Sequence, residues 1–370
     1  MARNCVINMI TNYEDSYDQL EIYTVVAMEE KRPERQSISH RGVKDRKYIR
    51  RDFGQGHERL FLDYFAEPPV YPSNLFQRRF RMRRCLFLQI QAVAEASDPY
   101  FIQKRNAAGM LGLSSLQKMI VALWMLAYRI TVDYMDEYLR IGESTALDSL
   151  KKFVKAIVVI YSNKYLRSPN NDDIAKLLAV GESRDFPGML GSIDCMHYKW
   201  KNYPTALSGM LPGSHNDINM LDRSPVFAEL AEDHGPPINY SINGNDYTMG
   251  YYLANGIYPQ WSTFIKTIPC PRGNKKKYFA SAQESTRKDI ERAFEVLQAR
   301  FAIVPQPAHF LNTKTLKYVM MACVILHNMI VEDERYVNGL EDFNYDAIDR
   351  SSQEPVSHKH TPEFMEFIQN

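Results

Sequence analysis

The sequence lacks the features that mark secreted and membrane proteins. Its five cysteines are scattered, with no CxxC pair and no framework spacing, which argues against a zinc ribbon and favours a reducing compartment. No run approaches the roughly 18 apolar residues of a membrane span, and no basic stretch followed by an apolar one stands at the N-terminus. Internal repeats and low-complexity tracts are also missing. We therefore expect a soluble, intracellular protein with no membrane contact.

A strong overall charge is also missing, but the charges are unevenly distributed. The formal net charge is only +1, with 45% hydrophobic and 24% charged residues, which is ordinary for a globular protein. Nine lysines and arginines lie within residues 31–51, and five arginines lie in "RRFRMRR" at 78–84. The stretch 331–350 is acidic. The positive charge therefore gathers in the N-terminal part, where a polyanion would be met.

The length of 370 residues is too great for one small core and suggests more than one domain. We expect a basic, disordered tail over 1–57, a helical region over 58–166, and a mixed domain over 174–335 with strands and helices. The segment 336–370 is expected to form an acidic tail. The Pro/Asn/Asp-rich stretch 167–173 suits a junction between the two folded parts.

The helical region has the outline of a helix-turn-helix. One 3.6-residue apolar period runs from about residue 73 to 94, and three more helical stretches follow at 114–128, 131–142 and 143–165. In the last stretch Lys151, Lys152 and Lys155 lie off the apolar stripe. They are candidate DNA contacts, together with Arg78, Arg79 and Arg81. A generic helical bundle with solvated lysines is the alternative from spacing alone.

Four polar positions stand out in the mixed domain. Asp194 lies in the middle of a predicted strand over 189–201, and Asp217 lies in "GSHNDIN". Asn255 ends "GYYLAN", and Glu291 lies on the helix "KDIERAF". Each position alone has a structural explanation, such as a cap, a turn or a solvated helix face. Together they follow the order expected of a divalent-metal site, in which oxygen ligands from two strand ends and a covering helix converge.

Long motifs in these regions resemble the plant PIF/Harbinger transposases. The resemblance is carried by "FPGMLGSIDCMHYKWKNYPTA", "PGSHNDINMLDRSP", "YYLANGIYPQW", "RKDIERAFEVLQARFAIV" and "ACVILHNMIVEDER". It extends back through "FRMRRCLFLQI" and "LGLSSLQKMIVALWMLAY" and covers roughly residues 55–335, in order.

The resemblance implies an α/β (mixed) fold: a helical N-terminal region with a helix-turn-helix-like segment, followed by an RNase H-like DDE nuclease domain. Such a domain binds Mg²⁺ or Mn²⁺ and cuts and joins DNA. The family's catalytic positions fall on Asp194, Asn255 and Glu291, and a further acidic metal position falls on Asp217. The metal ligands implied are therefore Asp194, Asp217 and Glu291. Family members often act with a separate Myb-like DNA-binding protein.

Two departures from the family pattern affect this site. The family motif "LADGxYP" reads "LANGIYP" here, so a neutral amide, Asn255, replaces a carboxylate. The segment near 206–212 is shorter than in the family, and the lost stretch would supply strands beside the Asp194 strand. We interpret the chain as a transposase-derived protein with impaired catalysis. Three alternatives stay open: an active nuclease in which Asp217 compensates, a domesticated non-catalytic DNA- or chromatin-associated protein, and a transposon relic with no role.

The basic clusters lead to two further expectations. A fragment of about residues 30–165 is expected to bind duplex DNA weakly, with an affinity that falls steeply with salt. The clusters "KRPER" and "RKYIRR" favour residence in the nucleus.

Overall fold

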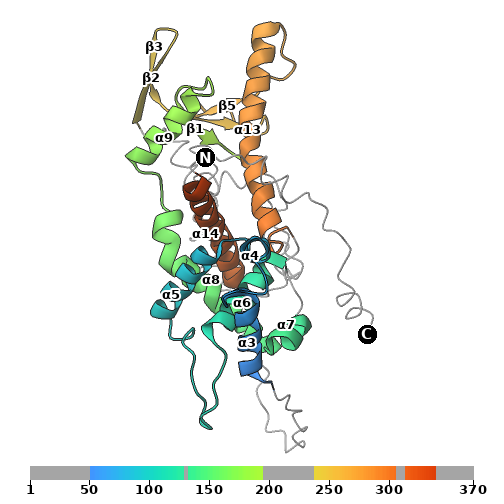
Figure 1. Ribbon diagram of the computed structural model, residues 1–370. Helices are drawn as coiled ribbons and strands as arrows, with labels where there is room; N and C mark the ends of the chain where they lie inside the picture. Colours follow the sequence, from blue (N-terminus) through green and yellow to red (C-terminus); the bar gives the residue numbers. More distant parts are fainter. Residues whose placement is uncertain (1–50, 129–131, 195–236, 306–312, 339–370) are drawn as a thin grey trace, which may run out of the picture.

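The computed structural model describes residues 51–128, 132–194, 237–305 and 313–338, and it combines a helical bundle with two small sheets (Figure 1). The fold is therefore of the mixed α/β kind that the sequence predicts. The helices are α3 (Phe53–Tyr64), α4 (Ser73–Phe80), α5 (Arg84–Ser97), α6 (Ser115–Tyr128), α7 (Val132–Leu139), α8 (Glu143–Tyr165), α9 (Asn171–Glu182), α13 (Asn274–Arg300) and α14 (Thr313–Asn338). The strands are β1 (Met189–Ser192), β2 (Pro237–Ile242), β3 (Asn245–Met249), β4 (Tyr251–Ala254) and β5 (Phe264–Lys266).

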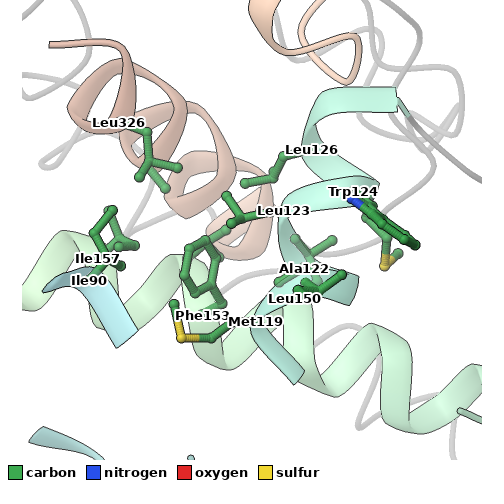
Figure 2. Close-up of a cluster of buried hydrophobic side chains, with 14 of the residues drawn as sticks. Ile90, Met119, Ala122, Leu123, Trp124, Leu126, Leu150, Phe153, Ile157 and Leu326 are labelled. Carbon is green, nitrogen blue, oxygen red and sulfur yellow. The ribbon is translucent and has the colours of Figure 1, made fainter. Parts of the chain in front are cut away.

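Helix α6 forms the centre of the bundle. Every residue of α6 from Ser115 to Ala127 is buried, as expected for a helix that is apolar on nearly all sides. Leu123 of α6, Phe153 of α8 and Leu326 of α14 meet in this core (Figure 2). The bounds of α6, α7 and α8 confirm the three helical stretches predicted at 114–128, 131–142 and 143–165.

The continuous helical period predicted over residues 73–94 is broken in the structure. Arg81 adopts a left-handed conformation with φ of 60°, which ends α4 and lets the chain turn into α5. The Arg81 guanidinium then lies 5.0 Å from the centre of the Tyr128 ring. Hydrophobic periodicity alone does not register such a break, because Phe80 and Phe87 face the same core on either side of it.

Two glycines of α3 provide a matched test of the packing between α3 and α7. We expect Gly54→Ala to stabilise the fold by up to about 1 kcal/mol, because alanine is the better helix former and the site is exposed. Gly56→Ala is expected to destabilise it by about 1–3 kcal/mol. The added Cβ would lie 2.7 Å from the carbonyl oxygen of Leu139 and 2.9 Å from Nε2 of Gln117.

The comparison is made by urea denaturation of both variants and the wild type. The two substitutions are chemically identical, so opposite signs isolate the close packing of Gly56 against Leu139 of α7 and Gln117 of α6. A stabilising Gly56→Ala would mean that α3 does not pack against the end of α7 in this way.

The helix α14 comes from the C-terminal part of the chain but lies in the same core as α6 and α8. Its stretch Lys314–Tyr336 is long and apolar enough to cross a membrane, which the sequence analysis did not anticipate. However, 67% of its most apolar window is buried inside the fold, as in the core helix of a soluble protein. Among the described helices no other stretch passes the same test.

The sheet that carries the candidate site has three parallel strands in the order β1-β4-β5. A separate antiparallel hairpin, β2-β3, turns at Asn243 and Gly244, which both have positive φ. Helix α9 leads into β1, and α13 packs across β1 and β4 (Figure 1). A small core of Phe186, Met189, Tyr251 and Leu253 joins these elements.

Helix α13 begins earlier than the sequence predicts. The lysine-rich sequence "RGNKKKY" at 272–278 predicts a loop, followed by a helix that starts near Ala280. In the structure Gly273, with φ of 82°, precedes a helix that already includes Lys275, Lys276 and Lys277. Lysine is a good helix former, so the charge cluster does not interrupt the helix.

The predicted basic tail over 1–57 also ends earlier than expected, because α3 begins at Phe53. Asp52 caps this helix by accepting a hydrogen bond from the backbone N–H of Gln55 at 3.0 Å. Arg51 forms an ion pair with Asp136 of α7. The packed structure therefore includes residues that composition alone assigns to the tail. Residues 1–50 and the acidic segment 339–370 lie outside the described residues.

Candidate functional site at the carboxyl edge of the sheet

Asp194 and Asn255 lie at the same edge of the three-stranded sheet. Asp194 follows β1 and Asn255 follows β4, and these strands are parallel neighbours with Ser192 paired to Leu253. The backbone N–H of Ile193 continues the pairing by donating to the carbonyl of Leu253 at 2.8 Å. Ligand sites of parallel sheets typically lie at this carboxyl edge. Strand β1 ends at Ser192, so Asp194 lies just beyond the strand, whereas the sequence predicted it in the middle of one. The Asp194 side chain is half-buried.

The side chain of Asn255 is used in its own turn. Its Oδ1 accepts a hydrogen bond from the backbone N–H of Gly256 at 2.6 Å. Its carbonyl accepts from the backbone N–H of Tyr258 at 3.3 Å. Lys266 at the end of β5 donates from Nζ to the carbonyl of Tyr258 at 2.7 Å. At this edge of the sheet the Asn255 side chain is a neutral amide that is hydrogen-bonded to backbone. The ammonium group of Lys266 lies against the adjacent turn.

Glu291 is held by an ion pair within α13. Its Oε1 lies 2.6 Å from Nη1 of Arg287, one turn earlier in the helix. The Arg287 side chain is only 13% exposed, whereas that of Glu291 is 39% exposed. The carboxylate charge of Glu291 is thus already balanced by a neighbouring cation.

The residue of α13 that lies over the strand ends is Gln283, which the sequence analysis missed. Gln283 is fully buried and donates from Nε2 to the carbonyls of Ala254 at 3.2 Å and Ile265 at 3.3 Å. It thereby links β4 and β5 next to Asn255. The sequence does indicate that Gln283 is buried, because positions 283, 290 and 297 are seven residues apart and fall on one buried face of α13. Glu291 lies eight residues later, about 12 Å further along the helix axis.

A metal centre is not assembled within the described residues. No group of three or more His, Cys, Asp or Glu side chains in these ranges is placed to hold a metal ion. Asp217 lies in the segment 195–236, outside the described residues. The assignment of Asp194, Asp217 and Glu291 as metal ligands therefore remains a prediction.

The arginines proposed to contact DNA are mostly engaged inside the helical region. Nη1 of Arg79 donates to the hydroxyl of Tyr64 at 2.6 Å, and its guanidinium stacks 3.9 Å from the centre of the Tyr71 ring. Burial raises the pKa of Tyr64 to about 12 despite the nearby cation. Arg81 packs on Tyr128, so Arg78 is the exposed member of the predicted trio.

The three lysines of α8 lie on its outer side. Lys151, Lys152 and Lys155 are all exposed. Lys151 forms a loose pair with Asp148 at 3.8 Å, with both side chains largely solvated. Lys152 lies 5.9 Å from the centre of the Tyr100 ring. These positions are accessible to a large anion, in contrast to Arg79 and Arg81.

Comparison with known proteins identifies relatives of the C-terminal part. Residues 163–211 and 210–338 match a family described as plant transposon protein. Residues 56–95, which include most of α3, all of α4 and most of α5, match a domain of unknown function (DUF8418). No curated protein and no solved structure matches the chain.

Proposed function

This chain is related to the plant transposon proteins over residues 163–338, and from that premise we propose that it descends from a PIF/Harbinger-type transposase. In this proposal the DDE nuclease site of the chain has lost the ability to cleave DNA. The parallel strands β1 and β4, with Asp194 and Asn255 at their ends, support an RNase H-like ancestry for the domain. The covering helix α13 carries Glu291. The helix-turn-helix-like outline of α6, α7 and α8 supports a DNA-directed origin for the bundle.

The main observation in support of lost activity is that Asn255 is neutral and already hydrogen-bonded to Gly256. A two-metal site needs anionic oxygens to offset the dehydration of each ion. At an effective dielectric constant of about 20, one charge pair at about 4 Å is worth roughly 4 kcal/mol. The amide supplies no charge, and its oxygen already accepts a hydrogen bond from Gly256. Asn255 is therefore a poor substitute for a bridging carboxylate.

The shortening of the domain supports the same conclusion. The two segments that match the plant transposon family overlap at residues 210–211, inside the range 206–212 where the sequence predicts that the chain is shorter than the family pattern. Two adjoining matches are what an internal deletion produces. In the part of the chain that the structure describes, β1 pairs only with β4, on one side. Strands from the lost stretch would have supported Asp194 from the other side.

We expect the purified full chain to show no Mg²⁺- or Mn²⁺-dependent nicking of supercoiled plasmid above background. Asn255→Asp alone should not restore nicking, because the lost strands still leave the Asp194 strand short of neighbours. The assay compares the wild type, Glu291→Gln, Asn255→Asp, and the double variant Asn255→Asp with Glu291→Gln.

Two outcomes would contradict the proposal in different ways. Robust nicking by the wild type that Glu291→Gln abolishes would establish an active nuclease, with Asp217 compensating for Asn255. Nicking restored by Asn255→Asp alone would show that the shortened sheet still closes around the metals. In either case Mg²⁺ or Mn²⁺ would be the cofactor.

A non-catalytic role on DNA is the second candidate, favoured by the exposed lysines of α8. In this proposal the full chain binds DNA in the nucleus, and a Myb-like protein is a partner carried over from the family resemblance. A fluorescent fusion excluded from nuclei would count against it.

A further inference from the structure

The connection between α5 and α6 forms an ordered arm. Residues 99–113 project from the helical bundle (Figure 1). A β-bridge joins Arg105 to Leu111, and the backbone N–H of Gly112 donates to the carbonyl of Lys104 at 2.8 Å. At the tip, Oδ1 of Asn106 accepts from the backbone N–H of Met110 at 2.9 Å. These bonds close the segment into a short hairpin with a defined shape.

The arm is cationic and apolar, with no carboxylate in its sequence. Its charges are Lys104 and Arg105, and Nη1 of Arg105 donates to the carbonyl of Gly109 at 2.7 Å. Ile102, Met110 and Leu111 expose about half of their side chains or more, at 50%, 60% and 48%. Phe101 and Leu113, at the two ends of the arm, pack in the bundle core, whereas Ile102, Met110 and Leu111 lie outside it.

Two ammonium groups lie close to the ring of Tyr100 at the base of the arm. Nζ of Lys118 donates to the carbonyl of Tyr100 at 2.7 Å and lies 4.9 Å from the centre of its ring, and Nζ of Lys152 lies 5.9 Å from that centre. The Tyr100 hydroxyl and Oγ of Ser149 are 2.9 Å apart. Burial and the charge of Lys104 both lower the pKa of Lys118, as expected for a cation without a counter-charge.

Two carboxylates lie near Tyr100. Asp98 accepts from the backbone N–H of Tyr100 at 2.8 Å, and Asp148 lies beside Lys151. Within the described ranges no carboxylate forms an ion pair with Lys104, Lys118 or Lys152. The base of the arm therefore presents excess positive charge next to the exposed face of α8.

We infer that the arm over residues 99–113 and the lysines around Tyr100 form one surface that binds the phosphate backbone of duplex DNA. The inference rests on the proposed descent from a DNA-directed protein and names the part of the chain that makes the contact. Lys104 and Lys152 bind phosphates at the base, and the apolar tip lies against the groove. Contacts of this kind fix position and do not read sequence.

The test measures binding of the full chain to a short duplex over a range of salt concentrations. Each phosphate contact adds about 0.9 to the slope of log affinity against log salt. The double variant Lys104→Ala with Lys152→Ala is expected to make this slope shallower by about 2. It should also weaken binding at least about tenfold at low salt. Both side chains are exposed, so the fold should be unaffected, and circular dichroism checks this.

The matched control is Lys275→Ala with Lys276→Ala, which removes two exposed lysines from the start of α13. It is expected to leave the slope unchanged. If the control lowers the slope and the Lys104/Lys152 variant does not, the surface is wrong while DNA binding stands. If the wild type fails to bind duplex at low salt, DNA is not the partner and the surface is rejected. Nuclease activity of the wild type would overturn the proposed loss of catalysis but leave this surface intact.

Discussion

A chain that ends after α8, at residue 165, is expected not to fold. Helix α14 contributes Val319, Ile325, Leu326 and Ile330 to the bundle core, and each is at most 1% exposed. Burying one such side chain is worth about 1.5–3 kcal/mol, so four of them contribute roughly 6–12 kcal/mol. Native proteins are stable by only about 5–15 kcal/mol in total. Without α14 the bundle would expose the apolar side chains of α8 that α14 covers.

The measurement is chemical denaturation of the fragment 51–165 and of the full chain. Unfolding is monitored by far-ultraviolet and near-ultraviolet circular dichroism. We expect a cooperative transition for the full chain and none for the fragment. In the full chain, Leu326→Asp should reproduce the loss, and Tyr336→Asp should not, because Tyr336 is 90% exposed on the same helix. Cooperative unfolding of the fragment would mean that α14 is dispensable.

This packing changes how DNA binding is best tested. The sequence suggests a fragment of residues 30–165 as the binding unit, because its basic clusters and helices lie within that range. The structure adds a helix from residues 313–338 to the same core. Residues 163–338, which match the plant transposon family, therefore end in α14, a helix that packs into the N-terminal bundle. Binding experiments therefore use the full chain.

The sequence predicts the helices of the bundle well because their apolar periods are long. It places α6 and α8 almost to the residue. It misses the break at Arg81 and the early start of α13, which depend on single left-handed residues and on contacts distant in sequence. The arm between α5 and α6 was also missed, since a β-bridge of one pair leaves no periodic signal.

The candidate site was predicted in part. Asp194 and Asn255 both follow parallel neighbouring strands and so lie at one edge of the sheet, while their assignment as site residues stays a prediction. The partners of these groups could not be predicted. Pairing of Glu291 with Arg287 and placement of Gln283 over the strand ends depend on how α13 rotates as it crosses the sheet.

Arg300→Met is expected to destabilise the fold by about 3–5 kcal/mol, the usual effect of breaking a buried ion pair from one side. Arg300 ends α13, and its side chain is 8% exposed. It pairs with Glu334 of α14 at 2.6 Å and donates to the carbonyl of His327 at 3.4 Å. Removing the guanidinium leaves the Glu334 carboxylate, 18% exposed, without this cation.

A surface pair on the same helix provides the control. Lys288 and Glu284 lie 3.2 Å apart but are 48% and 56% exposed, so Lys288→Met should cost less than about 1 kcal/mol. The double variant Arg300→Met with Glu334→Met should lose much less stability than the sum of its two single variants, because no buried charge is left behind. All variants are compared by urea denaturation. Equal losses of unfolding free energy for Arg300→Met and Lys288→Met would show that the Arg300–Glu334 pair is solvated. Burial of that pair would then not join the strand-bearing part of the chain to the bundle.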